Sequence, residues 1–145
     1  MIREFKGEFA WASNFWPARI VFGYEEYPTV EHAYQAAKTM RRDIREMIRT
    51  ASTAGEAKRL GRAIPVDAFQ PDWNLIKVDF MREFVHHKFC DPTLRRLLVA
   101  TGDEPLQEGN TWGDEFWGVN LKTGKGLNML GAILMIERAQ IVRAS

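Results

Sequence analysis

Apolar residues recur at helical spacing through much of the middle and end of the chain. The segment over 42–50 has one apolar face. Its members are Ile44, Met47 and Ile48. A longer segment opens at Pro71–Asp72 and runs to about Phe89, with a broader face. Its apolar residues are Leu75, Val78, Phe80, Met81, Phe84 and Val85. The stretch over 127–143 is strongly apolar. Each of these patterns predicts a helix.

Capping residues set the bounds of two more predicted helices. The helix over 29–40 begins with a threonine, whose hydroxyl can accept a backbone N–H of the first turn. The helix over 54–60 follows Thr53, which has capping-box spacing to Glu56. We expect Gly61 to end this helix, because glycine readily takes the left-handed conformation that follows many helices.

The second half of the chain contains one further capped helix and a long irregular stretch. Asp91–Pro92 supplies a cap and a proline at the first helical position. This helix is predicted to run to Thr101 and to stop at Gly102. Residues 102–126 are rich in glycine, tryptophan and polar residues. Long loops in compact domains are usually functional or disordered, and the aromatic residues favour an ordered loop.

The N-terminal part has the alternation and turn signals of short strands. Residues 2–9 predict a short strand, and 13–17 predict a loop. Arg19–Phe22 and Tyr24–Tyr27 flank Gly23 and predict a small hairpin. No repeat or linker interrupts the chain. The expected fold is therefore helix-rich α+β, one domain over 1–145, with a small antiparallel sheet near the N-terminus.

Composition limits the classes of function. The chain has 145 residues, 46% of them hydrophobic, which is enough for a domain with a core. No apolar run approaches the roughly 20 residues that span a bilayer, and the charged N-terminus has no signal-peptide core. The single cysteine, Cys90, suits a reducing compartment, so we expect a cytoplasmic protein. The net charge of +1 argues against a tight duplex-DNA binder.

The helix over 29–40 carries the most suggestive set of polar residues. Glu31, Gln35 and Lys38 are spaced i, i+4 and i+7, so they fall on one helix face. A proton acceptor, a hydrogen-bonding amide and a nucleophilic amine would then face one space. The alternative is a solvated stripe with a weak ion pair. His32 either lines the same cavity or packs in the core.

Two further residues have a functional and a structural interpretation. Asp114 lies in the turn-rich segment WGDEFWG, and a second carboxylate beside a sugar would assist glycosidic cleavage. The alternative is that Asp114 caps a loop. Arg62 follows the predicted helix stop and could bind phosphate through a bidentate pair. The alternative is an ordinary surface arginine.

Several familiar signatures are missing from the chain. Neither nucleotide-binding fingerprint, GxGxxG or GxxxxGK[ST], is present, and there is no GxSxG elbow. His86, His87 and Cys90 are close in sequence. Adjacent histidines point to different helix faces, and two ligands do not complete a tetrahedral zinc site. We therefore expect no metal.

Several sequence blocks follow one another from about Phe5 to Arg138. They are FAWASNFWPARI, YPTVEHAYQAAK, AKRLGR, DW-x3-K, KF, LLVATGD-x2-L-x-E, FWGV and GLNMLGAILMIER. Through these blocks the chain resembles the NADAR family, also described as YbiA-like N-glycosidases and formerly as a domain of unknown function. The blocks TVEHAYQAAK and N-x-LG-x-ILM-x-xR are specific in combination. The resemblance implies a single YbiA-like domain.

The resemblance also implies an activity. Enzymes of that family cleave an N-glycosidic bond between a base-like amine and a ribosyl group. Their described substrates are phosphoribosylated early intermediates of riboflavin synthesis and ADP-ribose attached to guanine in nucleic acid. The implied partners are a small phosphoribosyl or ADP-ribosyl substrate or ADP-ribosylated nucleic acid, with no cofactor and no membrane. Oligomeric state stays open.

Residue roles carry over from the family where its motifs match this chain. The helix glutamate maps to Glu31, as acid and base. The lysine maps to Lys38, as a nucleophile that forms an imine. The DW-x3-K block maps to Trp73, which would stack on the base, and to Lys77, which would join Arg62 in binding phosphate.

The second acid and the remaining substrate-binding positions also come from the resemblance. The acid maps to Asp114 or Glu115, and Asp114 is favoured because it lies three residues before Trp117, an alternative stacking residue. Gly131–Ala132 departs from the glycine–lysine pair of many relatives, which puts one phosphate contact in doubt. The other positions carried over are Asn14, Phe15, Gly118 and Asn128.

Two other classes of function stay open at this point. A non-catalytic ADP-ribose-binding module would bind its ligand tightly even after Glu31→Gln. A single-stranded nucleic-acid-binding protein would use its tryptophans as a stacking surface. Its affinity would depend strongly on salt.

Overall fold

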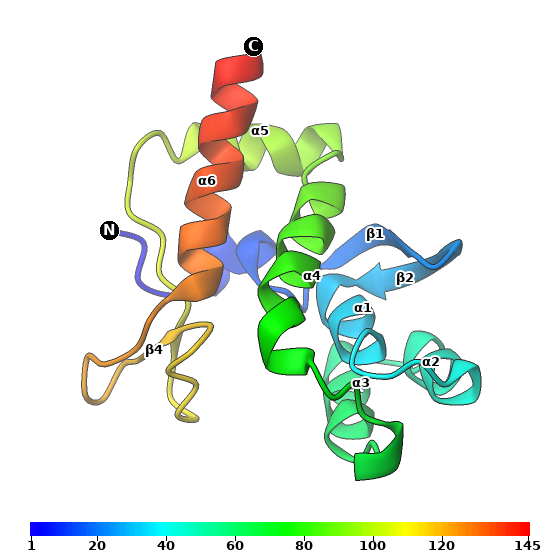
Figure 1. The fold of residues 1–145 in the computed structure, drawn as a ribbon. Helices are drawn as coiled ribbons and strands as arrows, with labels where there is room; N and C mark the ends of the chain where they lie inside the picture. The colour runs from blue at the N-terminus through cyan, green and yellow to red at the C-terminus, as the bar shows by residue number, and fades with distance from the viewer. The chain divides into compact units, whose positions relative to one another are not determined.

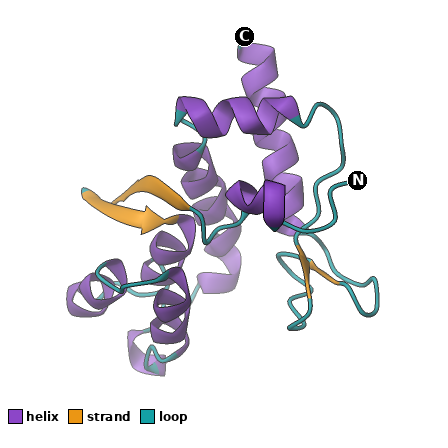
Figure 2. Ribbon diagram, turned by 180° about the vertical axis from the view of Figure 1, so that it is seen from behind, coloured by secondary structure: helices purple, strands orange, loops and turns teal.

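The computed structural model describes all residues, 1–145. Contacts within the chain divide it into two compact units. One unit is the continuous segment 14–88, and the other combines 1–13 with 89–145. Figures 1 and 2 show that helices predominate and that strands are few and short. The helix-rich α+β prediction is therefore confirmed.

The segment 14–88 begins with the predicted hairpin. Strand β1 (Pro17–Phe22) pairs antiparallel with β2 (Glu25–Thr29), and Phe22 lies opposite Glu25. The turn residues Gly23 and Tyr24 both have positive φ, 58° and 67°. Positive φ at both central residues is the mark of a type I′ turn, whose twist matches that of the flanking strands. The small antiparallel sheet near the N-terminus is thus confirmed.

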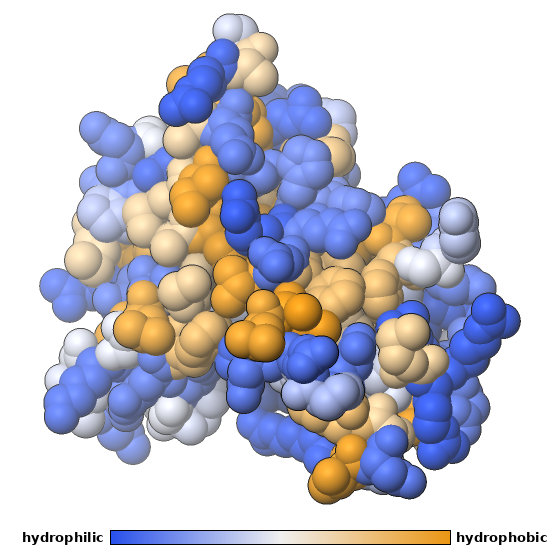
Figure 3. All heavy atoms as spheres, viewed as in Figure 1, coloured by the Kyte–Doolittle hydropathy of each residue, from blue (hydrophilic) through white to orange (hydrophobic).

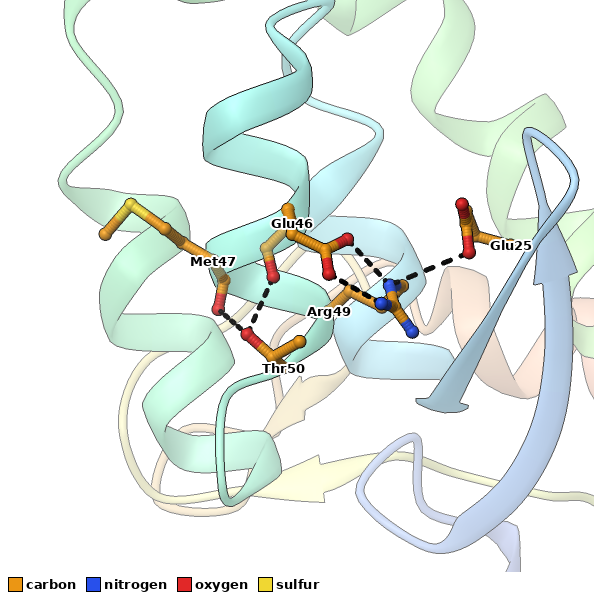
Figure 4. Close-up of polar contacts among 5 residues, drawn as sticks. All are labelled: Glu25, Glu46, Met47, Arg49 and Thr50. Carbon is orange, nitrogen blue, oxygen red and sulfur yellow. Dashed lines mark hydrogen bonds and ion pairs between the residues drawn. The ribbon is translucent and has the colours of Figure 1, made fainter.

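Helix α2 (Arg42–Arg49) packs beside the hairpin and is fixed to it by arginine contacts. Arg49 is bound in bidentate fashion by Glu46 of its own helix, and its Nε lies 4.0 Å from a carboxylate oxygen of Glu25 on β2 (Figure 4). Arg45 lies over the ring of Phe22, 4.5 Å from its centroid. Pairing of the guanidinium with an aromatic face adds to the packing of a short helix.

Helix α1 (Val30–Ala36) occupies the interior of this segment, and all of its residues are buried. It contacts β1, β2, α2, α3 (Ala54–Arg62) and α4 (Trp73–Lys88) (Figure 1). Water has little access to a helix surrounded on this scale, so its polar side chains depend mainly on partners within the protein. A short 3-10 helix, Val66–Ala68, leads into α4.

The predicted helix over 29–40 is wrong at its C-terminal end. Tertiary hydrogen bonds take the carbonyl groups that a longer helix would use. Gln70 donates its side-chain amide to Ala37 O and its backbone N–H to Lys38 O, and Arg45 Nε donates to Thr39 O. The helix ends at Ala36, and residues 37–38 form a turn.

The predicted stop at Gly61 is also wrong. Helix α3 continues through Gly61 to Arg62, and Gly61 has no positive φ. The side of Gly61 on which a side chain would lie faces α1. A Cβ at this position would overlap the side-chain oxygen of Gln35 and lie 2.6 Å from Gln35 Cδ. Glycine is needed here for close helix packing rather than for its backbone freedom. Thr53 caps the helix as predicted, through Glu56 N–H.

The second unit contains α5 (Pro92–Ala100) and α6 (Met129–Ala144), which pack on each other. Asp91 caps α5 through two backbone N–H groups, as its sequence predicts. Arg138 of α6 donates to Thr101 Oγ1 and to Glu104 O, at 2.8 and 2.9 Å. This buried arginine joins α6 to the end of α5.

The predicted strand over 2–9 is wrong. Ile2 makes an isolated bridge with Leu106, and the chain then turns at Gly7, with φ 58°, into a 3-10 helix, Gly7–Ala12. The irregular stretch after α5 is ordered by hydrogen bonds. It also contains a short parallel pair, β3 (Gly109–Asn110) with β4 (Val119–Asn120), which the sequence did not predict.

The surface has mixed character. On the face drawn in Figure 3, hydrophobic residues are interspersed among hydrophilic ones. Scattered exposed apolar residues are normal for a folded chain. No helix has both the length and the apolar character required to cross a bilayer.

Candidate functional site

Helix α1 places a carboxylate and an amide in the interior of segment 14–88. Thr29 caps the helix by accepting the N–H of His32. The N–H of Glu31 donates to Asn14 O at 3.1 Å, so the loop that contains Asn14 lies against the first turn. Glu31 is only 8% exposed. Its carboxylate therefore contacts mainly protein groups, and only a small part of it can be reached from solvent.

The side chains of Glu31 and Gln35 are directly bonded. Gln35 Nε2 donates to Glu31 Oε1 at 2.8 Å, a contact that i, i+4 spacing on one helix face allows. Gln35 is 3% exposed. The amide predicted to bind substrate therefore acts on Glu31 and is almost closed off from solvent.

Lys38 lies beyond the end of α1, in the turn that follows it, and is partly buried. The predicted stripe over two helical turns is therefore replaced by a helix and a turn. The pKa of the Lys38 amine is lowered, first by burial. The negative charge of Glu31 opposes this effect, which indicates that the two groups are close enough to interact. The ammonium also lies 5.4 Å from the centroid of Tyr34.

Three further cations act on Lys38. The charges of Arg62 and Lys58 on α3 and of Lys77 on α4 each lower the pKa of its amine, because like charges disfavour the protonated form. Arg62 and Lys77 were predicted as phosphate-binding residues. Through their common effect on Lys38 they form, with Lys58, a group of cations that we call the cation cluster: Lys38, Lys58, Arg62 and Lys77.

Two members of this site were not found from the sequence. Lys58 is four residues before Arg62, so the i, i+4 spacing on one helix could have indicated it. Tyr34 is four residues before Lys38, and its ring lies near both the Lys38 ammonium and the ring of Trp73. Neither residue stood out, because a lysine and a tyrosine on helices usually have simpler explanations.

His32 has a structural role. The ring is 2% exposed. Its Nε2 lies 3.1 Å from Ala51 O, a group that only accepts, so Nε2 carries the proton. Nδ1 then accepts from the Thr29 hydroxyl at 2.7 Å. Both ring nitrogens are bonded within the protein, which supports the packing interpretation over substrate binding.

This arrangement predicts a pH-dependent stability. Burial lowers the pKa of His32 from 6.5, so between the folded and unfolded pKa values the unfolded chain binds more protons. Stability then rises with pH in that window and falls as the pH drops below 6.5. We expect the free energy of unfolding to decrease by up to about 1.4 kcal/mol per pH unit there. Urea unfolding between pH 5 and 7.5 measures it.

His32→Gln is the matched variant for that measurement. It should lower stability at pH 7.5 and lose the slope between pH 5 and 6.5. The exposed carboxylates whose pKa values are lowered, such as Glu46 and Glu56, affect stability only at and below pH 4.5, which is outside this pH window. An unchanged slope in the variant would assign the effect to another group.

Trp73 belongs to an aromatic cluster. Its ring centroid lies 5.2 Å from Tyr34, 6.0 Å from Phe80 and 6.3 Å from Phe69. The residue is 6% exposed, so little of the indole remains to stack on a base. Stacking by Trp73 stays a prediction, and a contribution to the core is observed.

We therefore expect Trp73→Ala to lower the free energy of unfolding by about 3–5 kcal/mol, the usual cost of removing a buried aromatic ring. Leu75→Ala on the same helix is the control, because Leu75 is 80% exposed and should change stability by less than about 0.5 kcal/mol. Urea denaturation decides. If the two variants were equally stable, Trp73 would not contribute to the stability of the core.

The loop of Asn14 contributes at the entrance of α1. Asn14 Nδ2 lies 3.6 Å from Met81 Sδ, and its backbone carbonyl binds Glu31 N–H. Phe15 is exposed. These two residues lie beside the N-terminal turn of α1, where the sequence placed substrate-binding groups.

The other predicted positions lie in the second unit and have structural roles there. Asp114 Oδ1 accepts the backbone N–H groups of Phe116 and Trp117, at 3.1 and 2.9 Å, which is the loop cap that the sequence left as an alternative. Asn128 donates to Leu106 O and accepts from Glu108 N–H, both at 2.9 Å.

Gly118 and Trp117 complete this ordered loop. A Cβ on Gly118 would overlap Glu108 O and lie 2.8 Å from Asn110 Nδ2, so the position requires glycine for close packing. The ring of Trp117 packs edge-on against Phe116, with centroids 4.8 Å apart. No group of three or more His, Cys, Asp or Glu side chains is arranged to hold a metal ion.

Comparisons with known proteins agree on one family. The model of the NADAR domain matches residues 3–142. An N-glycosidase of Nostoc punctiforme is 41% identical over 133 residues, covering 89% of this chain and 83% of that protein. N-glycosidase YbiA of Escherichia coli K12 is 38% identical over 135 residues, covering 89% of this chain and 79% of that protein.

A riboflavin biosynthesis protein of Vibrio vulnificus is 38% identical over 130 residues. The match covers 89% of this chain and 35% of that longer protein. The NMR structure of Escherichia coli YbiA superposes with a TM-score of 0.85 at 33% identity, covering 99% of this chain and 84% of that one. The chain has a YbiA-like fold.

Proposed function

Because the chain belongs to the NADAR family, we propose that it is an N-glycosidase that hydrolyses the bond between a base-like amine and a phosphoribosyl group. The names of its relatives support hydrolysis of an N-glycosyl compound. One relative is a riboflavin biosynthesis protein, which supports an amine from riboflavin synthesis as the group that is released.

One observation carries the chemical part of the proposal: the environment of Lys38. Its amine is partly buried, and burial is the largest of the effects that lower its pKa. Three neighbouring cations lower it further, and Glu31 acts in the opposite sense. A lysine amine attacks a carbonyl-like carbon only when neutral. This setting therefore supplies the neutral amine at lower pH than an exposed lysine would.

A sequence of steps uses Glu31 and Lys38 in separate roles. In the bound complex the ammonium proton of Lys38 first passes to ionised Glu31, which leaves the amine neutral. Opening of the ribose ring then breaks the C1–O4′ bond, with the nitrogen lone pair forming an iminium at C1 and the proton passing from Glu31 to O4′. Neutral Lys38 then adds to C1. Its excess proton moves through Glu31 to the nitrogen of the base, and the C1–N bond to the base breaks. The sugar is left as an imine on Lys38.

Water completes the cycle. It adds to C1 of the lysine imine, the C1–Nζ bond breaks, and the sugar leaves as an open-chain aldehyde that can recyclise. Lys38 and Glu31 return to their starting protonation states. The sum is substrate plus water giving free amine and ribose phosphate, so no cofactor is needed.

The cation cluster supports a phosphorylated sugar. Lys58, Arg62 and Lys77 are brought together around Lys38 by α3 and α4, and a group of like charges is stabilised by an anion. Phosphate binding through such groups uses charge-assisted hydrogen bonds. Binding energy at a remote phosphate can also hold the sugar for reaction at C1.

The test is release of free amine from a ribosylamine 5′-phosphate, followed by chromatography. Parallel incubations use ADP-ribosylated guanine in DNA, the free nucleoside and plain ADP-ribose. Release from the phosphoribosyl compound supports the proposal. Tight ADP-ribose binding with no amine released from any substrate would instead indicate a binding module.

We expect removal of the 5′-phosphate to lower kcat/KM by at least about tenfold, since each hydrogen bond to a charged group contributes about 1.5–3 kcal/mol. Arg62→Gln should lower kcat/KM for the phosphorylated substrate only, so the difference in kcat/KM between the two substrates becomes smaller. Arg42→Gln is the control, because Arg42 is an exposed cation of α2 that is not among the charges acting on Lys38. Equal kcat/KM values with and without phosphate would contradict the role of the cation cluster.

A further inference from the structure

The Gln35 amide is bonded at one end only. Nε2 donates to Glu31 Oε1 at 2.8 Å, but Oε1 is buried and has no hydrogen-bond partner. Gln35 is 3% exposed, so no bulk solvent compensates. Buried polar atoms without partners are rare in folded proteins and call for an explanation.

Gly61 determines where this oxygen lies. A Cβ on Gly61 would overlap Gln35 Oε1 and come within 3.0 Å of Gln35 Cβ. The free carbonyl of the amide is therefore packed against the backbone of α3, in space that exists only because residue 61 is glycine.

We propose that Gln35 is a two-state positioning residue for Glu31, whose amide donates to the carboxylate when Glu31 is ionised and turns over to accept its proton when Glu31 is protonated. This inference deepens the proposed function, in which Glu31 alternates between these two states. Gln35 itself does not contact the reacting atoms.

The geometry makes the two orientations nearly equivalent. Rotation of the amide about its terminal bond exchanges Nε2 and Oε1, which differ little in size. In the observed orientation the oxygen facing Gly61 has no partner, and in the turned orientation the NH2 group would have none there. Each orientation leaves one polar group unsatisfied, so the protonation state of Glu31 decides between them. An amide bonded at both ends would resist this exchange.

The charges that surround the pair favour ionised Glu31 in the resting state. Lys38, just after α1, interacts with the charge of Glu31, and Lys58 and Arg62 on α3 and Lys77 on α4 act in turn on Lys38. On the hairpin and α2, the charged residues Glu25, Arg45, Glu46 and Arg49 act on Tyr27. The observed donation from Nε2 to the carboxylate agrees with this balance.

The decisive experiment is an NMR titration of the whole chain without substrate. The Glu31 carboxyl carbon and the Gln35 side-chain NH2 group are followed together over pH. We expect the Gln35 resonances to shift with the same midpoint as Glu31. A nuclear Overhauser contact from Gly61 Hα to the Gln35 NH2 protons should appear only at the acidic end.

Gln70 provides an internal control in the same spectra. Its Nε2 donates to Ala37 O at 3.0 Å, a carbonyl that does not titrate, so its resonances should stay constant through the Glu31 midpoint. Gln35 resonances as constant as those of Gln70, while Glu31 titrates, would overturn the proposal. The result does not depend on any enzymatic activity, so it is separable from failure of the proposed function.

A pair of alanine substitutions on α3 tests the part played by Gly61. Gly61→Ala should displace the amide and move the Glu31 midpoint to higher pH by about one unit, the scale of losing a hydrogen bond to a charged group. Gly55→Ala is the matched control, since a Cβ there meets only Thr53 Oγ1 at 3.9 Å. Equal midpoints in the two variants would overturn the role of Gly61.

Gln35→Leu removes the donor directly and should shift the midpoint in the same direction. If that variant does not fold, the wild-type titration and the alanine pair still decide. A folded Gln35→Leu protein with the wild-type midpoint and pH–rate profile would show that Gln35 only fills space.

Discussion

Lys38→Arg should fold normally and release no amine. Arginine keeps the positive charge of residue 38, so the balance with Glu31 and the cation cluster is largely preserved. A guanidinium stays protonated in proteins, so it cannot form an imine. We expect kcat to fall by at least about 10³-fold, equivalent to about 4 kcal/mol of transition-state free energy. Steady-state amine release measures it.

Borohydride trapping identifies the residue that forms the covalent bond. Reduction during turnover should convert the sugar imine to a stable amine adduct, seen by mass spectrometry on the peptide that contains Lys38. The Lys38→Arg protein should give no adduct. Lys122→Arg is the control, because Lys122 is an exposed residue of the second unit and should be active and labelled like wild type.

Full activity in Lys38→Arg would reject the covalent step. Glycosidic cleavage would then proceed by direct attack of water on C1, with Glu31 as the base. In that mechanism the role left for the cation cluster is to bind phosphate, and the lowered pKa of Lys38 would have no chemical use.

Glu31→Gln should also remove turnover while keeping substrate binding. The new amide is nearly isosteric, and its oxygen can still accept from Gln35 Nε2, so the buried helix α1 keeps its internal hydrogen bond. Loss of a general acid–base group typically lowers the rate by about 10²–10⁴-fold. We expect kcat to fall in that range with little change in the dissociation constant of the substrate, measured by calorimetry.

This variant separates the two residues. The charge of Glu31 raises the pKa of Lys38, so its removal should lower that pKa and leave the amine neutral at a lower pH. Inactivity of Glu31→Gln would then reflect missing proton transfer and not a missing nucleophile. Glu83→Gln on the exposed side of α4 is the control. Normal kcat in Glu31→Gln would rule out acid–base catalysis by this residue.

Local signals in the sequence predicted much of the fold. The hairpin turn at Gly23, the threonine caps and the Asp91–Pro92 helix start all depend on residues within a few positions of one another. The end of α1 could not be predicted, because it is set by Gln70 and Arg45, which are distant in sequence and take the last carbonyl groups.

The candidate site could also be predicted only in part, because local spacing does not indicate contacts between distant segments. The i, i+4 spacing of Glu31 and Gln35 predicted a shared helix face, and their side chains are hydrogen-bonded there. The packing of Gly61 on Gln35 depends on the approach of two helices, and no pattern along the chain indicates it. His32 and Asn128 both hold neighbouring backbone groups in place, and a role of Asn128 in substrate binding stays a prediction.

The division of the chain has a consequence for its biosynthesis. The unit that contains Glu31, Lys38 and the cation cluster is the unbroken segment 14–88, whereas the other unit needs both the first residues and everything after 88. A ribosome delivers the chain from its N-terminus, and units generally fold as their residues emerge. The segment with the proposed chemistry can therefore form its core first. Residues 1–13 must wait, with Trp11 still lacking Phe89, its ring partner at 6.2 Å, until the C-terminal half has been synthesised.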